Sequence, residues 1–249
     1  MRLKLFACEI LFRELCSLAA VSLHRIDLEF LPKGLHDIGK EKMSNQLTEA
    51  LAAVNESDYD AVLLGYALCS GGITGLKART IPLVVPRAHD CITLFLGSRY
   101  RYRDYFFANS GTYFKTTGWL ERSGDSLSQL GEWNTGTSGI PSQMGMNMSK
   151  QELAKRYGQD NGEYLYEQLT KMKHYSKLAF IETGVEPNDS FEQQTQELAE
   201  QKNWQYEKLQ GDLTLLRKLV NGNWDDDFLV VLPGQRIDFS YDDDIINAL

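Results

Sequence analysis

Five residues of this chain have side chains suited to holding a metal, and they follow a common pattern. Cys8, Cys69 and Cys91 each lie at or just beyond the end of a short apolar segment. His36 follows another such segment, and His89 lies two residues before Cys91. Thiolates are soft ligands suited to zinc and iron–sulfur clusters, and imidazole suits zinc and iron. We therefore predict a metal centre held by the three cysteines, with the histidines as a fourth ligand or as donors that orient the site.

These residues could build two different metal centres. A four-iron cluster held by three thiolates keeps one iron open to substrate, whereas three thiolates and one imidazole make a closed tetrahedral zinc site. We expect a 4Fe–4S cluster rather than zinc, with its open iron acting as a Lewis acid toward a small carboxylate or another small molecule. With zinc, the expected role is thiolate activation for methyl transfer.

Four further residues are candidates for binding the substrate. Gly71 and Gly72 come soon after Cys69, and glycines after a buried strand let backbone amides approach an anion closely. Arg87 lies near the same predicted sheet edge, where a guanidinium can clamp a carboxylate or phosphate. Lys115 lies in a segment that could close over the site. The alternatives are an ordinary tight turn at the glycines and a structural salt bridge at Arg87.

The cysteines also allow interpretations without a metal. They are compatible with small apolar side chains at crowded strand ends. A nucleophilic thiolate is a further alternative, because His89 and Asp90 beside Cys91 offer a base and an orienting carboxylate, although adjacent residues seldom face each other. Cys16 lies in a helical segment, and we expect it to be a buried structural thiol. The sequence leaves open whether the protein is an enzyme.

The elements that must position these residues alternate between strands and helices. Apolar runs predict strands at 2–7, 26–31, 61–66 and 81–85, and helical spacing predicts helices at 9–20, at 41–53 and from about residue 91. This alternation is typical of a parallel sheet with right-handed crossovers, a Rossmann-like α/β fold. Ligands of such sheets bind outside the carboxyl ends of the strands, where the three cysteines fall.

The rest of the chain predicts an insertion and a second α/β half. We interpret residues 99–148 as an insertion or lid. This segment holds an aromatic stretch from Tyr100 to Phe107, which we expect to pack in the core, and a Gly- and Ser-rich stretch. Ser149 and Glu152 form a capping box that predicts a helix to about Lys173. The predicted parts are 1–98 with the three cysteines, the insertion 99–148, and 149–249 with this helix and a second βαβ series whose strands lie at 178–182, 205–209 and 228–232.

The composition excludes several classes of partner. With 26 basic and 34 acidic side chains, the formal charge is -8, so nucleic acid and acidic membrane surfaces are poor partners. No apolar run approaches the roughly 18 residues of a membrane span, and charged residues interrupt the start of the chain where a signal peptide would be apolar. We therefore expect a cytoplasmic protein. Neither GxxxxGK[ST] nor GxGxxG occurs where a nucleotide cofactor would need it.

Several segments carry a family resemblance. The segments 64–72 (LGYALCSGG) and 86–98 (PRAHDCITLFLGS), supported by 7–11 and 181–184, resemble the DUF1638 family, a domain of unknown function of bacteria and methanogenic archaea. The resemblance covers nearly the whole chain. Ala67 departs from the family pattern, which prefers glycine at this position.

This resemblance implies a setting rather than an activity. Members of the family are linked by gene context to corrinoid-dependent methyl transfer in anaerobes, which implies an oxygen-poor cytosol and a corrinoid protein or methyltransferase as partner. It also implies a second class of function, a non-enzymatic accessory protein that docks such a partner and uses the thiols for packing or metal delivery. A metal-free thiol enzyme is the third hypothesis.

Overall fold

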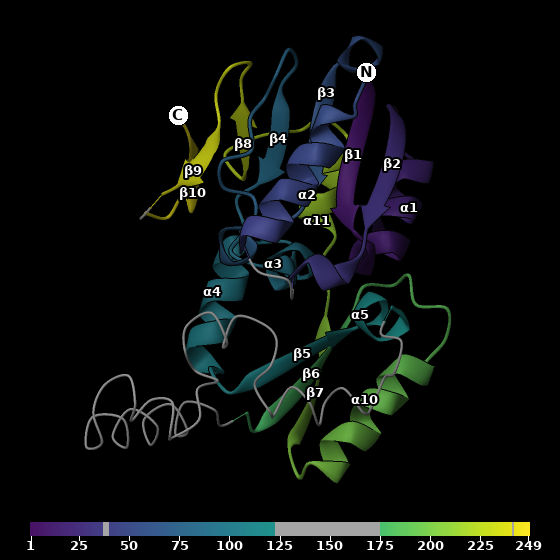
Figure 1. Cartoon of the computed structure of the whole chain (residues 1–249). Coiled ribbons are helices and arrows are strands. Elements are labelled where there is room, and N and C mark those ends of the chain that lie inside the picture. Colours follow the sequence, from purple (N-terminus) through teal and green to yellow (C-terminus); the bar gives the residue numbers. More distant parts are fainter. Residues whose placement is uncertain (37–39, 123–174, 241) are drawn as a thin grey trace, which may run out of the picture.

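The computed structural model describes residues 1–36, 40–122, 175–240 and 242–249. The predicted helix after Ser149 and most of the Gly- and Ser-rich stretch lie outside these residues, as does the side chain of His36. The fold is Rossmann-like α/β, which confirms the predicted fold class: a mostly parallel sheet of five strands and a second, parallel sheet of three strands, both flanked by helices. Figure 1 shows the two sheets in separate lobes, one above the other.

The first sheet has the strand order β2-β1-β3-β4-β8. Its strands are β1 (Arg2–Cys8), β2 (Arg25–Leu31), β3 (Ala61–Gly65), β4 (Leu83–Pro86) and β8 (Phe228–Val231). All five residues of β3 are buried, because this strand is covered on both faces and reads as a continuous apolar run. Strands β1 to β4 are parallel, so their carboxyl ends share one edge of the sheet.

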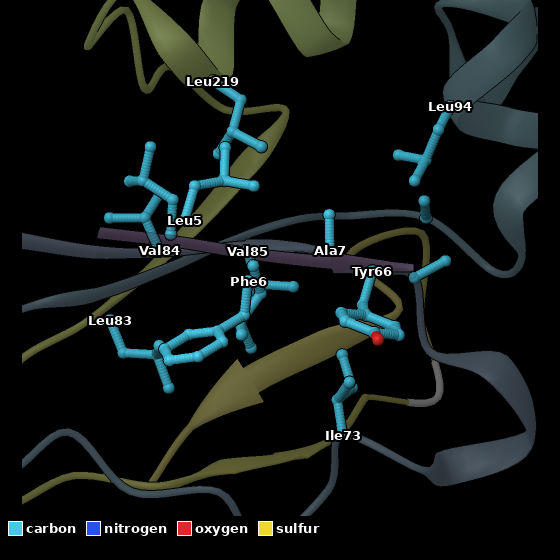
Figure 2. Close-up of a cluster of buried hydrophobic side chains, with 14 of the residues drawn as sticks. Leu5, Phe6, Ala7, Tyr66, Ile73, Leu83, Val84, Val85, Leu94 and Leu219 are labelled. Atoms are coloured by element: carbon cyan, nitrogen blue, oxygen red, sulfur yellow. The ribbon is translucent and has the colours of Figure 1, made fainter. Parts of the chain in front are cut away.

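Helices cover both faces of this sheet. Figure 1 shows α2 (Lys40–Ala52) in front of it and α1 (Phe12–Ala20) and α11 (Thr214–Val220) behind it. The core follows the alternation of the strands. In Figure 2, Leu5 and Val84 point to the side where Leu219 of α11 lies, whereas Phe6 points to the opposite side, together with Tyr66.

The second sheet has the order β5-β6-β7, formed by β5 (Thr112–Thr116), β6 (Lys177–Glu182) and β7 (Gln205–Gln210). The chain reaches it through α3 (Cys91–Leu96) and α4 (Arg99–Ala108), and β5 leads into α5 (Thr117–Glu121). Helix α10 (Ser190–Gln201) packs on this sheet through Leu198 and Ala199, which contact a small core around Tyr113 and Leu178. The carboxyl ends of these strands point toward the first lobe (Figure 1).

Two strands belong to other sheets than the sequence suggests. Strand β5 lies within the predicted insertion, yet it pairs in parallel with β6 over its whole length. The segment 228–232, predicted to end the second series, instead forms β8 and pairs antiparallel with β4 of the first sheet. The physical reason is the packing of α11 on α1 and on the first sheet, which brings the chain back beside the open edge of β4.

The aromatic stretch differs from its prediction as well. It forms α4, but none of its residues is buried, and Phe106 and Phe107 are 44% and 77% exposed. Only Tyr102 and Tyr105 are half-buried, because α4 touches the rest of the protein along one narrow side. The prediction of core packing is therefore wrong for most of this stretch.

Short elements complete the fold. The 3-10 turns are η1 (Glu9–Leu11), η2 (Lys33–His36), η3 (Glu56–Asp58) and η4 (Cys69–Gly71), and a terminal hairpin is formed by β9 (Ile237–Phe239) and β10 (Ile246–Ala248). Turn η1 begins directly after Cys8, the last residue of β1. Turn η4 begins at Cys69, which follows β3. In the part of the chain that the structure describes, no helix is long and apolar enough to cross a membrane.

Candidate functional site

Cys8, Cys69 and Cys91 line one pocket at the carboxyl edge of the first sheet. Cys8 is the last residue of β1, Cys69 follows β3, and Cys91 opens α3 after β4. The thiols come from three separate crossovers, and they meet because parallel strands end at one edge. Cys16 of α1 does not line the pocket, and it is half-buried, where burial raises the pKa of its thiol.

The rest of the pocket is mainly apolar. Its walls include Leu11 of η1, Leu35 of η2 and Leu94 of α3, and Trp119 of α5 reaches it from the second lobe. The pocket has a volume of about 20 Å³, which is room for about one water molecule. Apart from the cysteines, the described lining residues with a polar side-chain group are Tyr66, Lys33 and Trp119.

The backbone around Cys69 is strained and firmly tied. Cys69 has a φ of 44°, in the left-handed region that side chains with a Cβ seldom adopt. Its N–H donates to the carbonyl of His89 at 3.1 Å, and the N–H of Leu68 donates to the carbonyl of Ala88 at 2.8 Å. These bonds join the loops after β3 and β4, so Cys69 and Cys91 are fixed relative to each other. Strain held in place by surrounding contacts often occurs at functional sites.

The glycines after Cys69 serve packing. The N–H of Gly71 donates to the carbonyl of Leu68, and that of Gly72 donates to the carbonyl of Cys69. A Cβ at Gly72 would lie 2.3 Å from the sulfur of Met43, so a larger residue would displace this side chain of α2. Gly71 has a φ of 89° and lies against Phe239 of the terminal hairpin. Both amides are thus engaged within the turn, and they do not support the predicted anion-binding role.

Burial sets the protonation of the thiols. The pKa of Cys69 is raised to about 12, first through burial and then through the negative charges of Asp90 and Cys8. The pKa of Cys91 also lies well above its usual value, first through burial and then through Asp90, Cys69 and Cys8. These raised pKa values correspond to neutral thiols at Cys69 and Cys91 at neutral pH.

Asp90 positions Cys91 by capping α3. Its carboxylate accepts hydrogen bonds from the N–H groups of Ile92 and Thr93 at 3.0 and 3.3 Å. The hydroxyl of Tyr102 donates to the same side chain at 2.6 Å. Burial is the main cause that raises the pKa of Asp90, and these three donors oppose it. Asp90 therefore orders the first turn of α3 rather than activating the neighbouring thiol.

Tyr66 brings an unsatisfied hydroxyl to the pocket. It follows β3, its side chain is 4% exposed, and its Oη has no hydrogen-bond partner among the described residues. Burial is the largest cause that raises the pKa of this phenol, followed by the negative charges of Cys8 and Cys69. The phenol is therefore a neutral donor beside the thiols.

Arg87 is occupied by the terminal hairpin. Its Nη1 donates to the carbonyl of Asp244 at 2.9 Å and also to the carbonyl of Ile246. Its own N–H donates to the carbonyl of Asp227, just before β8. The contacts of Arg87 therefore indicate a structural role. Arg87 holds β8 and β10 against the sheet edge that carries the cysteines.

Neither predicted histidine contributes an observed ligand. The imidazole of His89 is exposed and is not among the described residues that line the pocket. His36 ends η2, and its side chain lies outside the described part of the structure. Among the side chains that are described, no group of three or more His, Cys, Asp or Glu residues is arranged so that it could hold a metal ion.

Lys115 is buried in the second lobe, away from the pocket walls. It lies on β5, is 4% exposed, and its Nζ lies 5.3 Å from the centre of the Tyr113 ring. Burial is the main cause that lowers its pKa to about 8, and the nearby charges of Lys33 and Lys202 lower it further. The structure thus brings Lys115 into electrostatic range of Lys33 but not into the pocket.

The two lobes meet tightly beside the pocket. A Cβ at Gly118 would lie 1.8 Å from the carbonyl oxygen of Ile10, so α5 touches η1 backbone to backbone. Arg13 of α1 forms a bidentate ion pair with Glu121 of α5, at 2.9 and 2.6 Å. The wholly buried Glu14 of α1 accepts a hydrogen bond from Thr183, the residue directly after β6. The pocket therefore lies at a fixed interface between the carboxyl edges of both sheets.

Three residues of this region carry weak sequence signals. Tyr66 is hidden in the apolar run 61–66, and Lys33 belongs to a Pro-Lys-Gly turn that looks like surface. Glu14 gives a clearer sign, because it falls on the same helical stripe as Leu11, Leu15 and Leu18. A carboxylate on an apolar stripe indicates a buried charge with a specific task.

Comparison with known proteins gives a family without an activity. The family model described as "Protein of unknown function (DUF1638)" matches residues 30–220, a range that spans both lobes and contains Cys69 and Cys91 but begins after Cys8. No curated protein and no solved structure matches the chain. With more than half of its length matched, this chain belongs to the DUF1638 family.

Proposed function

We propose that the pocket binds an iron–sulfur cluster through Cys8, Cys69 and Cys91. The observation that carries this proposal is the meeting of three thiols, from three separate strand ends, in one otherwise apolar pocket. Soft thiolates are the usual ligands of such clusters, and an apolar, largely enclosed surrounding protects them. When bound, a four-iron cluster with three cysteine ligands supplies a Lewis-acidic iron that is open to an oxygen ligand.

The donor set favours a cluster over a single zinc ion. A closed zinc site needs four ligands that meet at one ion. The exposed imidazole of His89 does not line the pocket, so a closed zinc site would need a different fourth ligand. A four-iron cluster with an open iron requires only three thiolates. Binding would remove their protons, so the positive iron offsets the charge that raises the pKa of Cys69 and Cys91.

A metal-free thiol enzyme has less support. A nucleophilic cysteine needs a low pKa, which proteins provide by a nearby cation or imidazolium. Here the pKa of Cys69 and that of Cys91 are raised, and the negative charge of Asp90 contributes to both shifts. A thiol enzyme would need a group that lowers the pKa of one thiol, whereas a cluster needs only the three thiols that line the pocket.

Metal analysis of anaerobically purified protein tests the proposal. We expect about four iron and four sulfide per chain, with broad visible absorption that dithionite changes. Replacement by serine at Cys69 or Cys91 should abolish cluster binding, whereas Cys16→Ser is the matched control and should keep it. A folded protein that holds neither iron nor sulfide after anaerobic reconstitution would refute the proposal, and one zinc per chain would favour the zinc alternative. If function in cells survives both substitutions, the accessory role gains instead.

A further inference from the structure

Lys115 is a buried lysine without an acidic partner in the described part of the chain. It lies on β5 in the second lobe, and its side chain is 4% exposed. Buried lysines normally pair with a carboxylate, because a buried charge without a partner is costly. Within residues 1–36, 40–122, 175–240 and 242–249, however, Lys115 Nζ forms no hydrogen bond or ion pair. It faces the ring of Tyr113, whose centre lies 5.3 Å away.

The charges that act on Lys115 are positive. Lys33 of η2 approaches from the first lobe, with its Nζ 5.1 Å from the centre of the Trp119 ring. Lys202, directly after α10, has its Nζ 5.3 Å from the centre of the Trp204 ring. Burial and then these two cations lower the pKa of Lys115 to about 8, and no carboxylate of the described residues raises it. About half of the Lys115 side chains are therefore neutral amines at pH 8.

A neutral amine in this setting suits a reaction with a small electrophile that creates a negative charge. A neutral lysine amine is a nucleophile, whereas the ammonium is not. Because Lys115 is 4% exposed, only a small molecule can reach its Nζ. The cations that disfavour an ammonium at this position favour an anion there. Carbon dioxide meets both conditions, because it is small and converts an amine into an anionic carbamate.

We propose that Lys115 is a modification site at which Nζ adds carbon dioxide and becomes a carbamate. The lone pair of the neutral amine attacks the carbon atom and forms an N–C bond, while one C=O electron pair moves onto oxygen. The nitrogen then releases a proton to water, so an amine and carbon dioxide give a carbamate anion and one proton. The product places an anion within range of the charges of Lys33 and Lys202. The reaction does not depend on the cluster proposal.

Covalent trapping of the carbamate in the full-length protein tests this inference. The protein is equilibrated with isotope-labelled bicarbonate at pH 8 and alkylated with triethyloxonium, which converts a carbamate into a stable ester. Digestion and mass spectrometry then locate the label. We expect the labelled ester on Lys115. Lys208 and Lys218 are internal controls and should stay unlabelled, because each ammonium is paired with two carboxylates.

The variants test whether the positive surroundings drive the reaction. Lys33→Gln and Lys202→Gln should each lower the trapped fraction about threefold, because each removes a charge that favours both the neutral amine and the anion. Lys208→Gln is the matched control and should leave the fraction unchanged. An unlabelled Lys115 in the wild type, or equal labelling of Lys208, overturns the inference without any variant. Labelling of Lys115 that neither Lys33→Gln nor Lys202→Gln lowers also overturns it.

Discussion

Glu14, Thr183 and Glu186 are joined by hydrogen bonds between the lobes. The hydroxyl of Thr183 lies within donating distance of Glu14 Oε1, at 2.9 Å, and of Glu186 Oε1, at 3.1 Å. Glu186 also accepts from the N–H groups of Thr183 and Gly184, both at 2.7 Å. The hydrogen bond from Thr183 lowers the pKa of Glu14, but burial of the carboxyl raises it by more.

The surroundings of Glu14 account for its raised pKa. Its side chain is 0% exposed, and burial is the main cause that raises its pKa from 4.5 to about 7, with a further increase from Glu186. The cation that lowers the pKa of Glu14, Arg13, is already paired with Glu121. Each pKa unit corresponds to about 1.4 kcal/mol, so Glu14 should lower the free energy of unfolding by about 3 kcal/mol as the pH rises from 4.5 to above 7.

The variant Glu14→Gln tests this magnitude. The amide oxygen can still accept from Thr183, but the amide does not titrate, so the variant should match the wild type at pH 5 and exceed its stability by up to about 3 kcal/mol at pH 8. Urea unfolding across this pH range measures the difference, and all other carboxylates cancel. Glu29→Gln, at a half-exposed pair with Lys4, is the control and should show little change. A difference between Glu14→Gln and wild type that is independent of pH would refute the raised pKa of Glu14.

Three further substitutions probe the supports of the pocket. Gly118→Ala should destabilise the protein by about 3 kcal/mol in urea unfolding, because its Cβ meets the carbonyl of Ile10; a change below 0.5 kcal/mol would contradict the close contact. Arg87→Met should free the terminal hairpin, seen as faster amide exchange in β10, and unchanged exchange would count against its strap role. Asp90→Ala should lower stability by about 1 kcal/mol through loss of the α3 cap, with Asp90→Asn retaining part of it; equal losses in the two variants would argue against capping.

The sequence predicts which residues lie at the edge of the sheet, but not what their side chains contact there. Cys8 ends a strand, Cys69 and Cys91 follow strands, and parallel strands end at one edge, so residue type and strand order together were enough to bring them to one pocket. The same rule places a residue at the edge without saying what it contacts. Arg87 shows this limit, because its partners lie 157 and 159 residues away in the terminal hairpin.

The pairing of strands needed information that the sequence pattern lacks. An apolar strand such as β8 can pair with any open edge that buries it, and its alternation does not name the edge. The choice is made by α11, whose packing on α1 brings the chain back to the first lobe. The sequence pattern also does not predict that the hydroxyl of Tyr66 lacks a hydrogen-bond partner among the described residues, since a buried tyrosine usually finds one.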